Sequence, residues 1–176
     1  MFKPIKFIFP TSIRAMITMA PITFPKKTLP NMKIYPCKNK KKTVTCIIGG
    51  SKVSTKINVL SSLLKNANNL VIVGAMANNF LKFKGVNVGA SLIEKGAENI
   101  VKDINMLAEK NKCNIVIPVD CNTSSGVNGS PVHKSLKDID SEDMILDIGK
   151  STMDLISKTI DGSNTVFWNG PAGYYE

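Results

Sequence analysis

Short apolar runs alternate along this chain with longer segments in which apolar residues recur every three or four positions. A short continuous apolar run is typical of a strand buried on both faces, whereas the three-to-four spacing predicts an amphipathic helix. A capping-box pattern at Ser91 and Glu94 predicts the start of a long helix. The runs predict strands at 43–48, 70–73, 114–119, 144–148 and 164–168, and the periodic segments predict further helices at 55–65, 76–84 and 151–160.

Strands that alternate with helices indicate a parallel sheet covered by helices on both faces, which is an α/β fold. We assign residues 40–176 to one such domain. Because ligands of these sheets bind at the carboxyl ends of the strands, the segments that follow the strands are the candidate binding loops. These segments are 49–56, 74–76, 120–123, 149–152 and 169–173.

Residues 1–39 do not share this pattern and are predicted to be a basic, poorly ordered leader. Six of the nine prolines lie before residue 43. The most apolar piece, 15–24, is interrupted by Pro21 and is too short to cross a bilayer. A signal peptide needs a continuous apolar core, and a transit peptide needs more arginine and serine.

The net charge of +10 raises nucleic acid as a partner, but the kind and position of the charges argue against it. Arg14 is the sole arginine, and no acidic residue precedes Glu94. Base reading and bidentate phosphate contacts favour arginine, so we expect neither a nucleic-acid module nor a membrane partner. The four cysteines have no spacing typical of zinc, which favours a reducing, cytoplasmic setting, and His133 is predicted to lie on the surface.

The stretch with the clearest chemistry is 46–56, C-I-I-G-G-S-K-V-S-T-K. An apolar run stops at two glycines, and Lys52 and Lys56 follow, four residues apart on one face of the predicted helix. Glycines allow close backbone approach, and the first N–H groups of a helix have no partner within it. The pattern suits a phosphate site, although it is not a P-loop, and a glycine turn with solvated lysines remains open.

Six motifs together resemble the C-terminal, nucleotide-binding half of phosphoglycerate kinase over roughly 40–176. The resemblance implies a Rossmann-like lobe, incomplete at its C-terminal end. It also implies transfer of a phosphoryl group between 1,3-bisphosphoglycerate and ADP in glycolysis, with ATP/ADP and Mg²⁺ as the nucleotide and metal. The motifs are I-I-G-G-S-K-V-S-T-K-I, G-A-M-A-N-N-F-L-K, G-A-S-L-I-E, I-P-V-D-C, L-D-I-G and V-F-W-N-G-P-A-G-Y-Y-E.

The resemblance assigns roles to individual positions. It places Gly50 and Ser51 in the turn beside the nucleotide, Lys52 near the transferring phosphoryl group as the catalytic residue, and Lys56 on the nucleotide phosphates. Two lysines at a helix start suit this chemistry, because phosphoryl transfer relies on positioning and on cations that neutralise charge. The remaining cofactor-binding positions are Gly74, Ala75 and Leu146 at the adenine, Asn169 and Pro171 in the cleft, and Glu176 at the ribose hydroxyls.

Departures from the family pattern lead to a second expectation. Thr55 stands where an aspartate is usual, Ala75 replaces a glycine, and Lys150 replaces a proline. The sequence also ends before the glycine-rich turn that helps hold Mg²⁺, so no metal ligand is assigned, and it lacks the lobe that binds 3-phosphoglycerate. The polypeptide alone is therefore expected to bind nucleotide weakly and to be inactive.

Two other functions stay open. One is a nucleotide-binding module without catalysis, completed by a complementing lobe on another chain. The other is an interaction role in which the basic leader binds an acidic partner.

Overall fold

The computed structural model describes residues 6–8 and 43–174, so the expectations for Glu176 and for the rest of the leader lie outside the described residues. Its main sheet has five strands in the order β1-β8-β2-β3-β4, and every neighbouring pair is parallel. Within the leader, β1 pairs with β8. The strands are β1 (Lys6–Ile8), β2 (Val44–Ile48), β3 (Asn69–Ile72), β4 (Asn114–Val116) and β8 (Thr165–Asn169).

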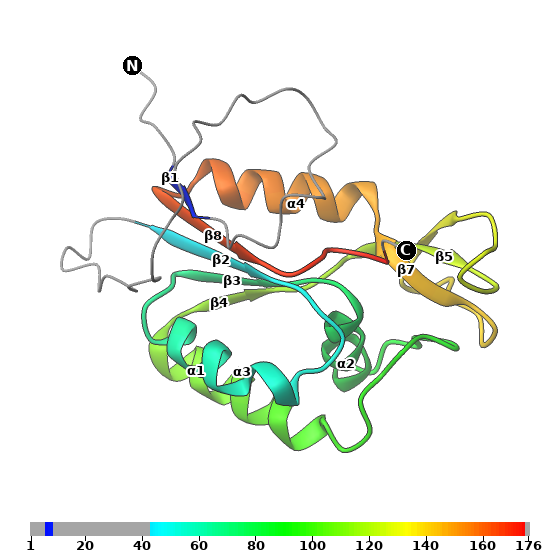
Figure 1. The fold of residues 1–176 in the computed structure, drawn as a ribbon, viewed down its shortest axis with the longest axis horizontal. Helices are drawn as coiled ribbons and strands as arrows, with labels where there is room; N and C mark the ends of the chain where they lie inside the picture. Colours follow the sequence, from blue (N-terminus) through cyan, green and yellow to red (C-terminus); the bar gives the residue numbers. More distant parts are fainter. Residues whose placement is uncertain (1–5, 9–42, 175–176) are drawn as a thin grey trace, which may run out of the picture.

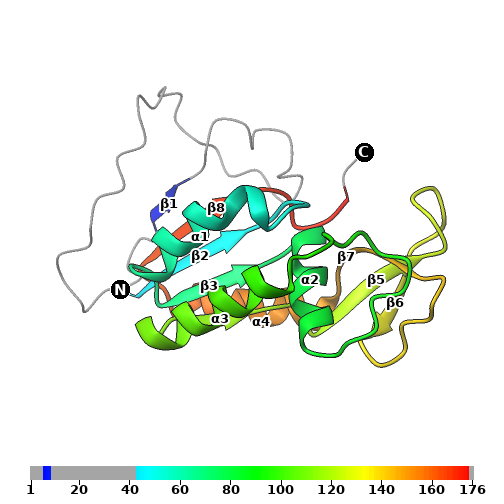
Figure 2. The same ribbon diagram turned by 90° about the horizontal axis from the view of Figure 1, so that it is seen from below.

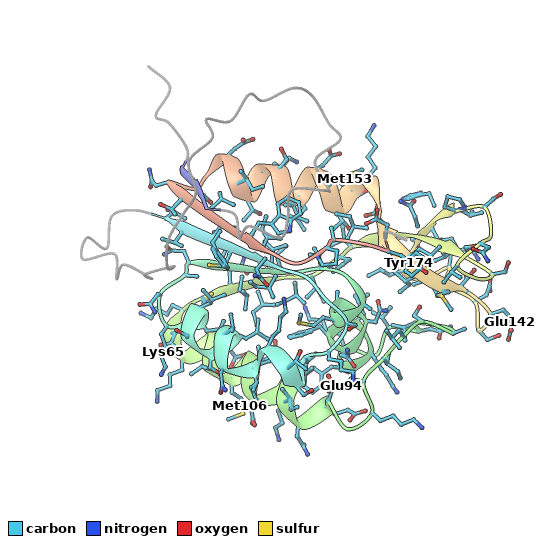
Figure 3. All side chains as sticks on the ribbon, viewed as in Figure 1. Lys65, Glu94, Met106, Glu142, Met153 and Tyr174 are labelled. Carbon is cyan, nitrogen blue, oxygen red and sulfur yellow. The ribbon has the colours of Figure 1, made fainter. Side chains whose placement is uncertain are left out.

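Helices cover both faces of this sheet, as the alternating pattern predicts (Figure 1). Helices α1, α2 and α3 lie on one face and α4 lies on the other, and the exposed Met106 of α3 and Met153 of α4 point away from the sheet on opposite sides (Figure 3). A turn of 3-10 helix, η2 (Ser54–Lys56), leads into the first of them. The helices are α1 (Ile57–Leu64), α2 (Ala75–Phe83), α3 (Glu98–Asn111) and α4 (Lys150–Asp161).

The apolar runs form two core layers because successive strand residues point to opposite faces. On β2, Cys46 and Ile48 pack toward α1, α2 and α3, whereas Ile47 packs toward α4. Cys46 is a free thiol, and burial raises its pKa to about 12, so it acts as a small apolar core residue.

The order of the strands places a switch point between β2 and β8. From β2 the chain moves to one side through β3 and β4, and it then returns to the other side of β2 as β8. Two neighbouring strands whose connections leave in opposite directions leave a crevice at their carboxyl ends, where ligands of open α/β sheets bind. The loops after β2 and β8 are therefore the first place to look for a site.

A second, antiparallel sheet lies beside the carboxyl end of the main one and was not expected from the sequence (Figure 2). Its order is β6-β5-β7. The expectation of a binding loop at 120–123 was wrong, and so was the implied place of 144–148 in the parallel sheet. Polar side chains and glycines dominate this region, so its local sequence pattern is that of a loop. Only pairing between distant segments defines the strands. They are β5 (Asp120–Ser124), β6 (Val132–Ser135) and β7 (Met144–Ile148).

The capping box predicted at Ser91 and Glu94 does not form, since α3 begins at Glu98 without a side-chain cap. Both side chains have partners elsewhere. The Ser91 hydroxyl accepts a hydrogen bond from the backbone N–H of Ile145, and the Glu94 carboxylate accepts one from that of Ser54. Among the described residues, no helix has the length and hydropathy needed to cross a membrane.

Candidate functional site

The loops after β2 and β8 touch at the switch point. The N–H of Gly49 donates to the carbonyl oxygen of Asn169 over 2.8 Å. A Cβ on Gly49 would collide with the carbonyl oxygen of Pro171, and one on Gly170 would collide with that of Gly49. The sequence therefore needs glycine here because two backbones meet without room for a side chain.

Lys56 bridges these two loops. Its Nζ atom donates to the carbonyl oxygen of Gly49 over 2.9 Å and to Oδ1 of Asn169 over 2.6 Å. Burial lowers the pKa of this lysine from its usual value. Both acceptors are uncharged, so among its described contacts the ammonium group has no anionic partner. A cation held at the carboxyl ends of two parallel strands is suited to bind an anion there.

Lys52 is arranged differently from the prediction. It precedes η2 and is exposed, so it does not share a helix face with Lys56. The chain turns at Gly50, whose φ of +137° favours glycine, and the buried Val53 then anchors the segment in the core. Thr55, which replaces the expected aspartate, donates its hydroxyl to the carbonyl oxygen of Lys52 over 3.0 Å. The hydroxyl therefore stabilises the lysine turn locally.

The loop after β3 interlocks with both other loops. Gly74 has φ of +67° and immediately precedes α2, and its N–H donates to the carbonyl oxygen of Ala172 over 2.9 Å. The N–H of Met76 donates to the carbonyl oxygen of Gly50 over 2.7 Å. These contacts set the amino end of α2, and with it Ala75, beside the switch point.

A cavity of about 500 Å³ opens next to these loops. Six predicted site residues line it: Gly50, Ser51, Gly74, Ala75, Leu146 and Pro171. Asn169, Lys56 and Lys52 are not among its lining residues, although the Lys56 side chain lies beside Gly50, which is one. Glu176 lies outside the described part of the chain. The largely apolar wall between α2, β7 and the loop after β8 suits a flat aromatic ligand.

Sequence reasoning missed several residues of this cavity. Leu92 and Val127 line it from loops and stay partly exposed, and Tyr174 lies where the loop after β8 passes β7. The N–H of Tyr174 donates to the carbonyl oxygen of Leu146 over 2.7 Å. Asp147 also lines the cavity. The motif L-D-I-G marked β7, but its local sequence gave no sign that a second sheet would carry it to α2.

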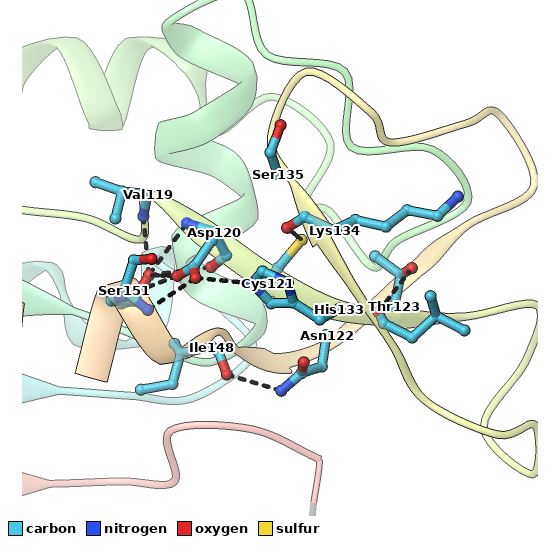
Figure 4. Close-up of polar contacts among 12 residues, drawn as sticks. Val119, Asp120, Cys121, Asn122, Thr123, His133, Lys134, Ser135, Ile148 and Ser151 are labelled. Carbon is cyan, nitrogen blue, oxygen red and sulfur yellow. Dashed lines mark hydrogen bonds and ion pairs between the residues drawn. The ribbon is translucent and has the colours of Figure 1, made fainter. Parts of the chain in front are cut away.

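A polar cluster around Asp120 joins the second sheet to α4 (Figure 4). The Asp120 carboxylate is buried and accepts hydrogen bonds from the backbone N–H groups of Ser151 and Thr152, from the Thr152 hydroxyl and from Nε2 of His133. Burial opposes ionisation, but these hydrogen bonds outweigh it and lower the pKa of Asp120. The carboxylate therefore stabilises the amino end of α4.

The same cluster explains His133 and Gly149. His133 is exposed, as predicted, and its carboxylate partner comes from the neighbouring strand, so sequence proximity did not reveal it. A Cβ on Gly149 would collide with the Asp120 carboxyl group, so this glycine serves packing. The predicted binding segments 120–123 and 149–152 thus meet each other in a structural contact.

Comparisons with known proteins bear on the family and the fold of this chain. A sequence model of the phosphoglycerate kinase family matches residues 30–176. The phosphoglycerate kinase of Wolbachia pipientis wMel is 43% identical over 138 residues, and that of Bartonella bacilliformis is 45% identical over 145 residues. The solved phosphoglycerate kinase of Coxiella burnetii superposes with a TM-score of 0.73 at 31% identity and covers 77% of this chain.

These relatives are longer proteins. The matched part covers 78% of this chain but only 35% of each of the two bacterial sequences, and 36% of the Coxiella burnetii chain. The chain therefore spans about a third of the length of the curated relatives it matches.

Proposed function

The chain belongs to the phosphoglycerate kinase family, and we propose that its described part is a nucleotide-binding lobe that holds ADP or ATP for phosphoryl transfer. The observation that carries the proposal is the meeting of three glycine loops beside one cavity, with the ammonium group of Lys56 next to Gly50, a residue of the cavity lining. A largely apolar cavity next to a fixed ammonium group is the arrangement that a purine and its phosphates need.

The base of the nucleotide would lie in the cavity, against Ala75, Leu146 and Pro171. Ala75 adds one methyl group to this wall compared with the family's glycine. That methyl group narrows the cavity, but the volume of about 500 Å³ remains large enough to admit a ligand. We therefore expect the base to bind, although more weakly than with glycine.

The phosphates would extend toward the switch point. There the side chain of Lys56 is held in place, and Gly50, which has no side chain, leaves its backbone accessible to a ligand. An added Cβ at Gly50 would lie 3.5 Å from Cε of Lys56, so the glycine keeps space beside the ammonium group. Lys52, exposed on the preceding turn, would then reach the terminal phosphate. In this proposal Lys56 binds and orients the nucleotide, and Lys52 neutralises charge on the phosphoryl group that moves.

The family uses Mg²⁺ with its nucleotide, and the metal would neutralise phosphate charge. Among the described residues there is no cluster of three or more His, Cys, Asp or Glu side chains that would hold a metal ion. In the proposed arrangement the residues named above would act on the phosphates, and no metal ligand is proposed among them.

For the whole protein we propose the glycolytic reaction of the family, transfer between 1,3-bisphosphoglycerate and ADP, in the cytoplasm. A polypeptide of these 176 residues alone should bind nucleotide weakly and show no turnover, because its phosphoglycerate kinase relatives have chains about twice as long. A lobe on a second chain that binds 3-phosphoglycerate would complete it.

The test is a calorimetric titration of the purified chain with MgADP, with circular dichroism to establish folding. Two variants that each remove one positive charge distinguish binding at the site from general attraction to the protein surface. Lys52→Ala removes the exposed lysine of the site turn, and Lys65→Ala removes a lysine at the far end of α1 (Figure 3). We expect Lys52→Ala to weaken MgADP binding about tenfold, since a charged contact contributes about 1.5–3 kcal/mol, and Lys65→Ala to bind like the unchanged chain.

A folded chain that does not bind millimolar MgADP would overturn the proposal. Equal effects of the two lysine variants would also overturn it, because general charge attraction and not a site would then account for the binding.

A further inference from the structure

Glu94 makes a long-range contact that the proposed site does not explain. It lies in the segment between α2 and α3, at the beginning of the η2–α1 helix (Figure 3). Its Oε2 atom accepts a hydrogen bond from the backbone N–H of Ser54 over 3.1 Å, across 40 residues of sequence. Ser54 follows Lys52 by two positions, so this contact holds the turn that carries the exposed lysine.

The segment that carries Glu94 is itself fixed to α2. The backbone N–H of Glu94 donates to Oδ1 of Asn79 over 2.9 Å, and Nδ2 of Asn78 donates to the carbonyl oxygen of Leu92 over 3.0 Å. Both asparagines are buried, with 1% of the surface of Asn78 and 6% of that of Asn79 exposed. Asn79 also donates through Nδ2 to the carbonyl oxygen of Met76, so its amide is hydrogen-bonded through both its nitrogen and its oxygen. Buried amides with such partners hold a backbone in one geometry.

These contacts form a continuous path. It runs from the amino-terminal half of α2, through Asn79 and Glu94, to Ser54 and the Lys52 turn. Leu92, two residues before Glu94, lines the cavity. One short segment therefore contacts both the apolar cavity and the turn with the exposed cation.

The charge state of Glu94 suits this contact. Hydrogen bonding from Ser54 lowers its pKa, with smaller contributions from the backbone of Val53 and from the charge of Lys52. A carboxylate near the first N–H groups of a helix is favourable.

We propose that Glu94 is a positioning residue for the phosphate end of the site: through Ser54 it fixes the turn that presents Lys52 to the terminal phosphate of a bound nucleotide. This inference rests on the proposed function. Glu94 does not touch the nucleotide in this arrangement, and its effect is transmitted by the turn.

The alternative role is competition, in which the Glu94 carboxylate pairs with the ammonium group of Lys52 and a nucleotide phosphate must displace it. The structure favours positioning, because the carboxylate accepts a hydrogen bond from the backbone N–H of Ser54, and because buried asparagines fix the segment behind it. A competing side chain needs freedom to leave, and this segment is restrained on the α2 side.

The experiment compares Glu94→Ala, Glu94→Gln and the control Glu98→Ala, which removes an exposed glutamate from the first turn of α3. Hydrogen exchange at the Ser54 amide is measured by NMR without nucleotide. Binding of ADP and of AMP is then measured by calorimetry. Gln keeps an oxygen acceptor without the charge, so it separates hydrogen bonding from charge.

We expect Glu94→Ala to speed hydrogen exchange at the Ser54 amide about tenfold. It should also weaken ADP binding about tenfold while leaving the affinity for AMP unchanged. Glu94→Gln should keep most of the exchange protection of Ser54 and most of the ADP affinity, and Glu98→Ala should match the unchanged chain in both measurements. A loss of structure alone would weaken AMP as well as ADP.

Unchanged Ser54 exchange in Glu94→Ala would overturn the inference whether or not nucleotide binds. Tighter ADP binding in both Glu94 variants would also overturn it, in favour of competition. If the unchanged chain binds no ADP while Ser54 exchange responds as expected, the proposed function fails, and with it the phosphate role of Glu94, but the contact that fixes the turn stands.

Discussion

The Nζ atom of Lys56 lies 2.6 Å from Oδ1 of Asn169, which joins the segment after β2 to the last residue of β8. Its other acceptor is the carbonyl oxygen of Gly49. A cation with two neutral acceptors is oriented without being neutralised, and it retains its attraction for an anion. The switch point of the sheet thus holds a fixed positive charge.

The Lys56–Asn169 contact predicts a charge-sensitive site. Asn169→Asp would put a carboxylate next to the ammonium group, and the resulting ion pair would compete with phosphate. We expect MgADP affinity, measured by calorimetry, to fall about tenfold. The control is Asn164→Asp at the opposite end of β8, which keeps the oxygen that accepts from the N–H of Thr43. Unaltered affinity in Asn169→Asp would place the phosphates elsewhere.

The contact between the loops after β2 and β8 predicts a steep stability difference between two glycines. Gly49→Ala would drive a methyl group into the carbonyl oxygen of Pro171, and we expect a loss of about 3 kcal/mol in the free energy of unfolding. Gly126→Ala meets no atom within 4 Å and should change it by less than about 0.5 kcal/mol. Urea denaturation measures both, and similar losses would mean that the loops do not touch.

Asp120 predicts a pH-dependent stability. Its folded-state pKa is lowered, so the carboxylate contributes stability above its unfolded-state pKa of about 3.9, and this contribution is lost as the pH falls through the folded-state value. We expect Asp120→Asn to cost about 2 kcal/mol at pH 7, because the hydrogen bonds to a charged acceptor are lost, and less below about pH 4.

Denaturation at several pH values measures that difference, with Asp154→Asn on the exposed face of α4 as the control. A cost for Asp120→Asn that stays constant from pH 7 to pH 3 would show that the carboxylate charge does not stabilise α4.

Two neighbours on α1 test the core. Leu60 has 0% of its surface exposed and packs beneath the sheet, whereas Val59 is 46% exposed. Leu60→Ala should lower the free energy of unfolding by about 3 kcal/mol, since it removes buried methyl groups and leaves a cavity. Val59→Ala should cost less than about 0.5 kcal/mol. Equal effects in thermal or urea unfolding would mean that α1 presents a different face to the sheet.

The sequence predicted those parts of the fold in which local pattern and burial agree. Cys46, Ile47 and Ile48 form one unbroken apolar run because both faces of β2 are covered, and the run therefore marks the strand. The glycines after β2 and β3 likewise marked the loops that reach the cavity. In these places a short window of sequence contains the physical cause of the structure.

The wrong predictions share one cause: the residue whose hydrogen bond or strand pairing determines the local structure lies far away in sequence. Ser91 and Glu94 have the spacing of a helix cap, but the N–H groups of Ile145 and Ser54 bind them instead. Asn122 and Thr123 have the composition of a loop, but pairing with β6 and β7 makes them a strand. Tertiary contacts override a local preference of this size.

The place of β8 beside β2 has a consequence for synthesis of the chain. The N–H of Thr43, just before β2, donates to the side chain of Asn164, which is 121 residues further along. At a translation rate of about 5–20 residues per second, β2 would wait roughly 6 to 24 seconds for this neighbour. During that interval the β2 edge is unpaired outside the ribosome, where other nascent chains or a chaperone compete for it.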